Sequence, residues 1–206
     1  MRITGCEIRH CNAGWRDFSF LKLTTDDGIT GLAEYNECYG SPGLSTVIRR
    51  LVERVTGMDA MAHERVHQCL YAMTRQAPGG VNQQAIATIE NALLDIKGQA
   101  LNVPVYDLLG GAIRQEIPVY WSHCGTYLLD PEIAAQCRQE PIHSADDLVA
   151  LGRRVREAGY SGLKTNMITF DEDGKVGRHM PGFARGPGWP ELNTPHRLVG
   201  QLRDQL

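Results

Sequence analysis

Several features that would place this chain in a specialised class of protein are missing from its 206 residues. No apolar run is long enough to span a bilayer, and the segment Met1–Glu7 contains no apolar signal core. The net charge of -3 gives no overall field that would attract nucleic acid or an anionic membrane. We therefore expect a cytoplasmic protein that binds neither.

Paired cysteines are also missing. The six cysteines form no C-x-x-C pair and no compact framework, which favours free thiols over disulfides or a zinc ribbon. What the chain does have is 42% apolar and 22% charged residues, a composition typical of a globular protein with a hydrophobic core. The scattered cysteines are Cys6, Cys11, Cys38, Cys69, Cys124 and Cys137.

The first half of the sequence predicts an α+β domain over residues 1–112. Residues 1–37 have the pattern of a three-stranded antiparallel meander, with a hairpin turn at Asp26-Asp27-Gly28. Three amphipathic helices are expected to follow, because apolar residues recur at helical spacing. The first begins at Ser41-Pro42 as N-cap and first position, and ends at Gly57. The expected inward residues of the other two are Val66, Cys69, Leu70, Met73, Ala85, Ile86, Ile89, Ala92, Leu93, Ile96 and Ala100.

Near residue 112 the pattern changes to alternating strands and helices. Residues 117–122 predict a strand, and Ser144 with Asp147 forms a capping box that opens a helix with Leu148, Leu151, Val155 and Ala158 inward. Gly159 ends this helix, and a strand containing Lys164 follows. This order is the signature of parallel β/α units.

The remaining residues predict a Gly- and Pro-rich loop over 169–193 and a helix from Thr194 to the last residue. Residues 113–206 would then form the first two β/α units of a modified TIM barrel. A closed barrel usually needs about 250 residues, so we expect the chain to be truncated.

The run from Ala87 to Gly111, followed by Arg114 and the segment 117–120, resembles the mandelate racemase and muconate lactonizing branch of the enolase superfamily. The resemblance implies a capping domain over a β/α barrel, with the substrate held between them. Family members abstract the proton next to a carboxylate, and magnesium and a lysine stabilise the enediolate. The three magnesium ligands lie on the third to fifth barrel strands in the family, so no residue here is assigned as a metal ligand.

Lys164 and Asn166 are the predicted catalytic residues. They lie two apart in an expected strand, so their side chains share one face. By position, Lys164 matches the family's lysine that contacts the substrate carboxylate. Asn166 replaces a lysine that serves many relatives as general base, and an amide cannot take up a proton at neutral pH. The Lys-x-Asn pattern resembles galactonate-dehydratase-like acid-sugar dehydratases. A barrel-rim lysine without a chemical role is the alternative interpretation.

Other candidate substrate contacts lie in loops. The loop 12–17 matches the mobile capping loop of the family, and residues 36–39 match its second capping loop. His123 follows the first barrel strand, and the loop 169–193 carries arginines suited to an acid sugar. The alternatives are an ordinary turn for the loop 12–17 and a strand exit for residues 36–39. For His123 the alternative is a structural histidine, and for the loop 169–193 it is an oligomer-contact or mobile loop. The predicted contacts are Trp15, Arg16, Asn36, Glu37, Tyr39, His123, Arg178 and Arg185.

A rival interpretation rests on His63-Glu64-Arg65-Val66-His67, which is a literal H-E-x-x-H. In a zinc peptidase both histidines bind zinc and Glu64 activates water, and Glu90, followed by Asp95, lies where some peptidases place a third ligand. The other interpretation is a solvated, charged helix face, because the helix falls within the capping-domain pattern.

We therefore expect the N-terminal portion of a magnesium-dependent lyase that acts on a small-molecule sugar acid, most of all by dehydration. Racemisation or cycloisomerisation is the alternative within the superfamily. A zinc metallopeptidase and a non-catalytic interaction module are the alternatives outside it. The complete protein is expected to be a homo-oligomer, and the 206-residue chain alone is expected to be inactive.

Overall fold

The computed structural model describes residues 1–178 apart from 15, 39, 125, 166–167 and 171–175. The chain divides into two compact units, Met1–Gln115 and Glu116–Leu206. Each unit has its own cluster of buried apolar side chains. Among the described helices, none combines the length and the apolar character that crossing a bilayer requires.

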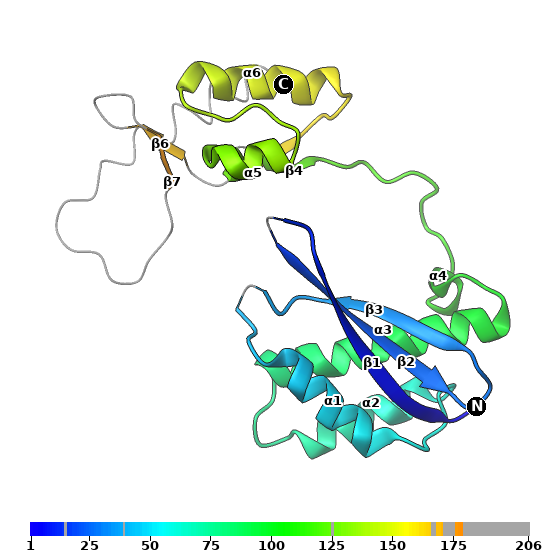
Figure 1. The fold of residues 1–206 in the computed structure, drawn as a ribbon. Helices are drawn as coiled ribbons and strands as arrows, with labels where there is room; N and C mark the ends of the chain where they lie inside the picture. Colours follow the sequence, from blue (N-terminus) through cyan, green and yellow to red (C-terminus); the bar gives the residue numbers. More distant parts are fainter. Residues whose placement is uncertain (15, 39, 125, 166–167, 171–175, 179–206) are drawn as a thin grey trace. The chain divides into compact units, whose positions relative to one another are not determined.

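The first unit is built on an antiparallel sheet with the strand order β1-β2-β3 (Figure 1). The strands are β1 (Ile3–Asn12), β2 (Asp17–Thr25) and β3 (Thr30–Tyr35). The turn between β2 and β3 has Gly28 at φ 83°, a conformation that glycine adopts without steric cost. The predicted meander is confirmed, including its Asp-Asp-Gly turn.

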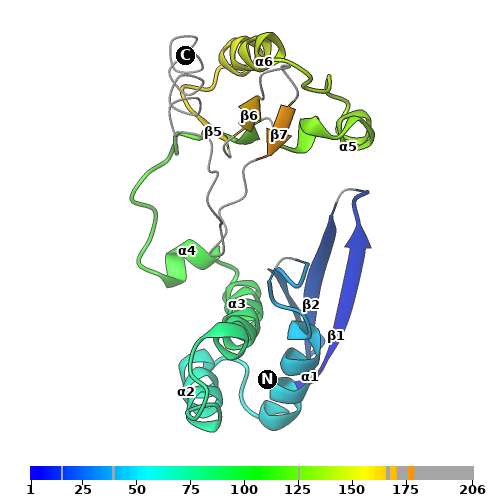
Figure 2. The ribbon, with the colours of Figure 1, turned by 90° about the vertical axis from the view of Figure 1, so that its left-hand side faces the viewer.

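Helices cover one face of this sheet, as Figures 1 and 2 show. α1 (Leu44–Val55) and α3 (Gly80–Leu101) pack on the strands, α2 (His63–Met73) packs on these two helices, and the short α4 (Val105–Leu108) follows α3. The alternation of β2 places Leu21 and Leu23 against the helices, where both are fully buried. The core is completed by residues on all three long helices, among them Ile48, Val66, Leu70, Ile86, Ile89, Leu93 and Ile96.

Some details of the predicted helices are wrong. Gly43, not Ser41, precedes the first helical residue, because the Ser41 hydroxyl instead donates to Gln84 Oε1 at 2.7 Å. Cys69 is only half-buried, while Met73 and Ala100 are exposed. Met73 and Ala100 lie in the last turns of their helices.

Strand β3 packs directly on α3 through a glycine. A Cβ atom built on Gly31 would lie 2.0 Å from the carbonyl oxygen of Ala92 and 2.8 Å from Ile96 Cγ1. No side chain fits at such distances, so glycine is required here by the close approach of strand and helix.

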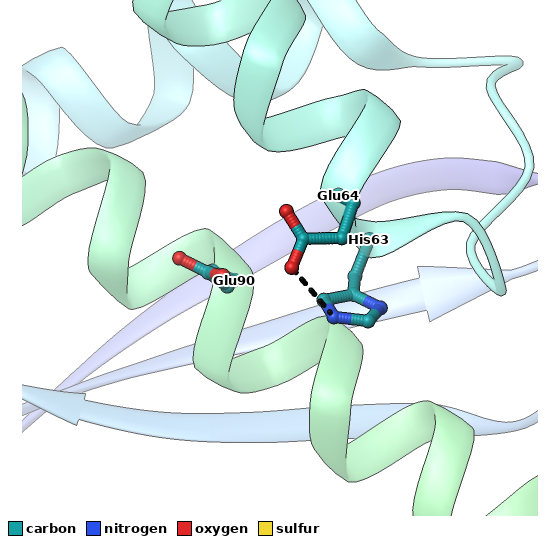
Figure 3. A group of neighbouring side chains, drawn as sticks. All are labelled: His63, Glu64 and Glu90. Atoms are coloured by element: carbon teal, nitrogen blue, oxygen red, sulfur yellow. Dashed lines mark ion pairs between the residues drawn. The ribbon is translucent and has the colours of Figure 1, made fainter. Parts of the chain in front are cut away.

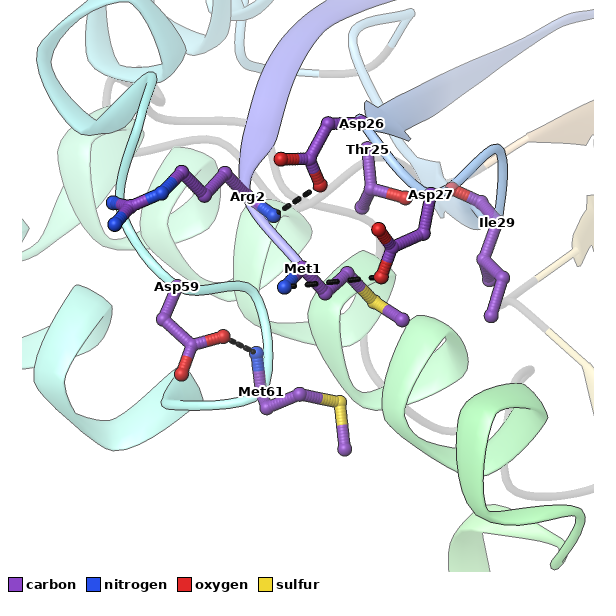
Figure 4. A network of polar contacts seen from close by, with 8 residues as sticks. All are labelled: Met1, Arg2, Thr25, Asp26, Asp27, Ile29, Asp59 and Met61. Atoms are coloured by element: carbon purple, nitrogen blue, oxygen red, sulfur yellow. Dashed lines mark hydrogen bonds and ion pairs between the residues drawn. The ribbon is translucent and has the colours of Figure 1, made fainter.

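The start of β1 is held by a network of polar contacts (Figure 4). The backbone N–H of Arg2 donates to Asp26 Oδ1 at 2.6 Å, and the amino group of Met1 lies 3.7 Å from Asp27 Oδ2. The Asp26 pKa is lowered, chiefly by the hydrogen bond from the Arg2 backbone. Ile3 also bonds through its backbone to Gly57 and Met58, which ties the strand to the segment after α1.

The second unit contains a parallel pair of strands. Its described elements are β4 (Trp121–Cys124), the 3-10 turn η1 (Tyr127–Leu129), α5 (Pro131–Gln136), α6 (Ala145–Glu157), β5 (Leu163–Thr165), β6 (Ile168–Phe170) and β7 (Val176–Arg178). β4 and β5 pair in parallel, and β6 and β7 form an antiparallel hairpin. The predicted β/α order is confirmed for the described segment from β4 through α6 to β5.

The capping box of α6 is confirmed. Ser144 Oγ accepts the backbone N–H of Asp147, and Asp147 Oδ2 accepts the backbone N–H of Ser144 at 2.9 Å. Leu148, Leu151 and Val155 are buried as expected, whereas Ala158 is exposed because it lies just beyond the last helical residue.

The predicted strand over 117–122 is wrong in its first four residues. Ile117 and Val119 are 75% and 62% exposed, and the strand begins at Trp121, whose backbone N–H donates to the carbonyl of Gly162. Pro118 has no N–H to donate to a neighbouring strand, which explains the later start.

Two further predictions concern loops and cysteines. The predicted loop 169–193 is wrong at its start, because the β6–β7 hairpin occupies its described part, while the predicted helix from Thr194 lies outside the described residues. Five of the cysteines have free thiols in the described part of the chain, namely Cys6, Cys11, Cys38, Cys69 and Cys137.

Candidate functional site

The catalytic candidate Lys164 lies in the middle of β5 with its side chain exposed, while Leu163 and Thr165 are half-buried. The parallel register pairs Leu163 with Trp121 and Thr165 with Cys124. The register shifts between these two pairs, so both Ser122 and His123 of β4 lie opposite Lys164. The structure thus brings the backbones of two predicted site residues together, at the edge where parallel strands present their carboxyl ends.

This strand pair provides no magnesium site by itself. Residues 121–124 and 163–165 include neither aspartate nor glutamate, and magnesium prefers carboxylate oxygens. Lys164 is a cation and cannot act as a metal ligand in its charged form. Carboxylate ligands for magnesium would therefore have to come from residues outside these two strands.

Hydrogen bonds within the first capping loop, residues 12–17, join its two ends. The backbone N–H of Ala13 donates to the carbonyl of Arg16 at 2.9 Å, and the side-chain amide of Asn12 donates to Asp17 Oδ1 at 2.7 Å. The guanidinium of Arg16 lies over the ring of Phe18, with Cζ 4.4 Å from its centroid. This cation–π contact gives the Arg16 side chain a defined direction on the β2 side of the loop.

The second capping loop is anchored to α1 by Glu37. Its carboxylate accepts the backbone N–H of Gly43 at 2.9 Å and the hydroxyl of Ser45. Ser45 in turn lies 2.7 Å from the hydroxyl of Tyr35. Burial raises the pKa of Tyr35, although the Ser45 hydrogen bond acts in the opposite direction. Both oxygens of Glu37 are thus engaged within the protein, so a substrate would have to compete with these bonds.

The other predicted contacts are placed as follows. Asn36 is exposed directly after β3, and Arg178 is the last residue of β7. Trp15, Tyr39, Asn166 and Arg185 lie outside the described residues.

The H-E-x-x-H motif begins α2, and the structure gives it a different arrangement from that of a peptidase. Donor atoms of His63, Glu64 and Glu90 all lie within 4.8 Å of one another (Figure 3). His67 is not a member of this group, and its Nδ1 instead lies 2.9 Å from Glu90 Oε2. Asp95, which follows Glu90 on α3, accepts the backbone N–H of Leu32.

The structure also contains a cationic groove that the sequence analysis did not predict. It has a volume of about 610 Å³ and lies between α1 and the segment that follows α2. Arg50, Arg54 and Arg75 line it together with apolar side chains such as Leu51 and Met73. The i, i+4 spacing of Arg50 and Arg54 places them on one helix face and was the available signal.

Comparison with known families gives a match over residues 10–110 to the mandelate racemase / muconate lactonizing enzyme, N-terminal domain. The matched range contains most of the meander and the three long helices that cover it. The chain belongs to this branch of the enolase superfamily. The first unit is the capping domain of that family, as the resemblance in the sequence predicted.

Individual relatives support the same assignment. A D-galactonate dehydratase of Xanthomonas axonopodis pv. citri (strain 306) is 38% identical over 120 residues, which are 58% of this chain and 31% of that protein. A solved candidate L-alanine-DL-glutamate epimerase of Burkholderia xenovorans strain LB400 is 38% identical with a TM-score of 0.88. That alignment covers 100% of this chain and 53% of the other.

A third relative is a solved member of the enolase superfamily from Salmonella Typhimurium, 25% identical with a TM-score of 0.81. It aligns with 100% of this chain and with 52% of its own length. The chain thus spans about a third of the dehydratase and about half of the two solved structures.

Proposed function

We propose that this chain supplies the capping domain and the first barrel strands of a magnesium-dependent enzyme that dehydrates a sugar acid. The observation that carries the proposal is the place of Lys164 on β5, beside the parallel strand β4, in a chain related to D-galactonate dehydratases. In this proposal residues 1–112 form the capping domain and residues 113–206 belong to the barrel.

Lys164 is proposed to hold the substrate carboxylate. Removal of the α-proton places a second negative charge next to that carboxylate, so a fixed cation stabilises the product of proton transfer more than the substrate. Asn166 is proposed to hydrogen-bond the substrate, because its amide offers donors and an acceptor but no basic site. The base would therefore come from another strand. Magnesium, when bound, would supply further stabilisation of the enediolate, through ligands outside β4 and β5.

The loop residues are proposed to close the site. Trp15 and Tyr39 would exclude water, and Arg16 and Asn36 would bind substrate oxygens. Because Glu37 is bonded to the start of α1, we propose that it positions the second loop and contacts substrate only indirectly. On the barrel side, His123, Arg178 and Arg185 are proposed substrate contacts.

The test is a screen of aldonic and aldaric acids for loss of water. It uses the polypeptide that carries this chain together with the further barrel strands that the proposal requires. Lys164→Met should lower kcat by about 100- to 1,000-fold, the usual effect of removing one group that stabilises a developing oxyanion. Lys22→Met, on strand β2, is the matched control and should leave kcat unchanged.

The proposal is wrong if no acid sugar loses water, or if Lys164→Met and Lys22→Met behave alike. Racemisation of another carboxylate in the same screen would favour the alternative suggested by the epimerase-like structure. Two further parts of the proposal are that the active enzyme is a homo-oligomer and that the 206-residue chain alone does not catalyse the reaction.

A further inference from the structure

Two helices of the capping domain bring an imidazole and two carboxylates together on a face that the proposed function does not use. His63 and Glu64 are the first two residues of α2, and Glu90 lies on α3 (Figure 3). A nitrogen of His63 and one oxygen of each glutamate lie within 4.8 Å of one another. Zinc bonds such donors at about 2.0–2.2 Å, so adjustment of the side chains would let all three reach one ion.

Two of the three side chains are mostly buried, and the third is exposed to solvent. The side chains of His63 and Glu90 are 18% and 27% exposed, whereas that of Glu64 is 76% exposed. Glu64 Oε1 nevertheless turns toward the ring and lies 3.7 Å from His63 Nε2. Water can therefore reach the group from the Glu64 side, while His63 and Glu90 are held by the packing of α2 on α3.

His67 orients one member of the group. Its Nδ1 lies 2.9 Å from Glu90 Oε2, which leaves Glu90 Oε1 available for another partner. The His67 ring is stacked on Tyr71, with centroids 6.4 Å apart, so its own direction is fixed as well. A hydrogen bond of this kind to a ligating carboxylate is a common way of tuning a metal site.

We propose that His63, Glu64 and Glu90 bind a divalent transition-metal ion of the zinc class and thereby clamp α2 to α3. One imidazole with two carboxylates is a donor set that suits zinc, and water would complete the coordination. The ion also balances charge, since oxygens of two carboxylates lie within 4.8 Å of each other. This site is distinct from the magnesium site of the proposed function, and its test does not depend on catalysis.

Lys97 gives the proposal a specific consequence. Its Nζ lies 3.5 Å from His63 Nδ1, and because an ammonium group can only donate, the ring nitrogen must accept this hydrogen bond. A neutral His63 then carries its own proton on Nε2, which faces Glu64. Binding of a metal through Nε2 requires the other tautomer and must displace Lys97. The lysine is thus a competitor of the metal ion.

The experiment is a zinc titration of the metal-free 206-residue chain in competition with a chromogenic chelator. One zinc per chain is expected. His63→Ala, Glu64→Gln and Glu90→Gln should each weaken binding by about tenfold or more, and His67→Phe should weaken it less, through Glu90. Lys97→Met should strengthen binding. His10→Ala, a β1 histidine bonded to Ser19, is the matched control and should leave the affinity unchanged.

Thermal unfolding provides a second readout. Zinc should raise the unfolding temperature of the parent chain and of His10→Ala, but not that of His63→Ala, because only an ion bound to the folded state stabilises it. Circular dichroism of each metal-free variant verifies that it is folded.

Three results would overturn the proposal. They are no zinc bound by the parent chain, equal affinity of His63→Ala and His10→Ala, and zinc retained by Glu64→Gln but lost from His67→Phe. The last result is the pattern of a zinc peptidase, in which both histidines are ligands and the glutamate acts on water.

Discussion

Asp95 on α3 accepts the backbone N–H of Leu32 on β3, with Oδ2 2.8 Å from the nitrogen. One turn further along α3, the side-chain amide of Gln99 donates to the carbonyl of Thr30 at 2.9 Å. β3 pairs with β2 on one edge only, so these two side chains occupy donors and acceptors on its other edge. A helix thus protects an edge strand that would otherwise be open to pairing with another chain.

Replacing Asp95 should therefore have two effects. Asp95→Ala should lower the free energy of unfolding by about 1.5–3 kcal/mol, the usual contribution of a hydrogen bond to a charged group, and should increase aggregation. Asp95→Asn keeps an acceptor in place and should cost less. Urea unfolding and light scattering measure the two effects, and equal behaviour of the two variants would contradict the assignment.

The contact between Gly31 and α3 predicts a larger loss. Gly31→Ala forces a Cβ against the Ala92 carbonyl, so the strand or the helix must shift, at a cost of about 2–3 kcal/mol. Gly5→Ala is the matched control on β1, because the nearest atom to its Cβ is Thr24 Oγ1 at 3.9 Å. Similar unfolding midpoints for the two variants would show that the sheet and α3 are not in such close contact.

The capping box of α6 predicts a dependence on pH. The backbone N–H of His143 and the hydroxyl of Ser144 lower the pKa of Asp147. A carboxyl with a lowered folded pKa contributes stability above its unfolded pKa of about 3.9 and loses it as pH falls through the folded value. The difference in unfolding midpoint between the parent chain and Asp147→Asn should thus be full at pH 6 and shrink below pH 4.

Asp146→Asn is the control for this experiment. Asp146 lies in the same first turn of α6 and is exposed, and it makes no capping contact. An equal pH dependence for both variants would mean that the first-turn charge, rather than the capping box, produces the effect.

Ser45 should matter more than either of its partners for the stability of the capping domain. It lies between Tyr35 and Glu37, so Ser45→Ala leaves the buried tyrosine hydroxyl without this partner and takes one bond from Glu37. We expect a loss of about 1–3 kcal/mol, the cost of an unsatisfied buried polar group. Tyr35→Phe removes the same hydrogen bond but leaves no buried tyrosine hydroxyl without a partner, so it should lower the free energy of unfolding by less. The reverse order in urea unfolding would contradict this network.

The sequence predicts the elements of this fold where local signals are strong. The Asp26-Asp27-Gly28 turn, the stripe along α3 and the Ser144–Asp147 box are read directly from residue spacing, and all are present. The sequence places the start of β4 too early, because the apolar pattern begins at Ile117, before the residues that pair with β5. The β6–β7 hairpin was missed, since strands of three residues are too short to show a period.

The candidate site was less accessible to sequence analysis for a physical reason. Spacing indicates which residues share a face, but it does not indicate which partners a side chain already has. Glu37 is the clearest case, because its bonds to Gly43 and Ser45 depend on the path of the loop before α1. The separation of His67 from the group of His63, Glu64 and Glu90 likewise depends on how α2 packs on α3.

The parallel pairing of β4 with β5 also has a consequence for folding kinetics. The strands of the meander meet across short turns, whereas Trp121 reaches Leu163 only after α5 and α6 have been accommodated between them. Closing a longer loop costs more entropy, and contacts distant in sequence form more slowly. We therefore expect the meander and its helices to fold early, with β4 and β5 the last described strands to find their partners. Until then those short strands are the segments on which a chaperone would act.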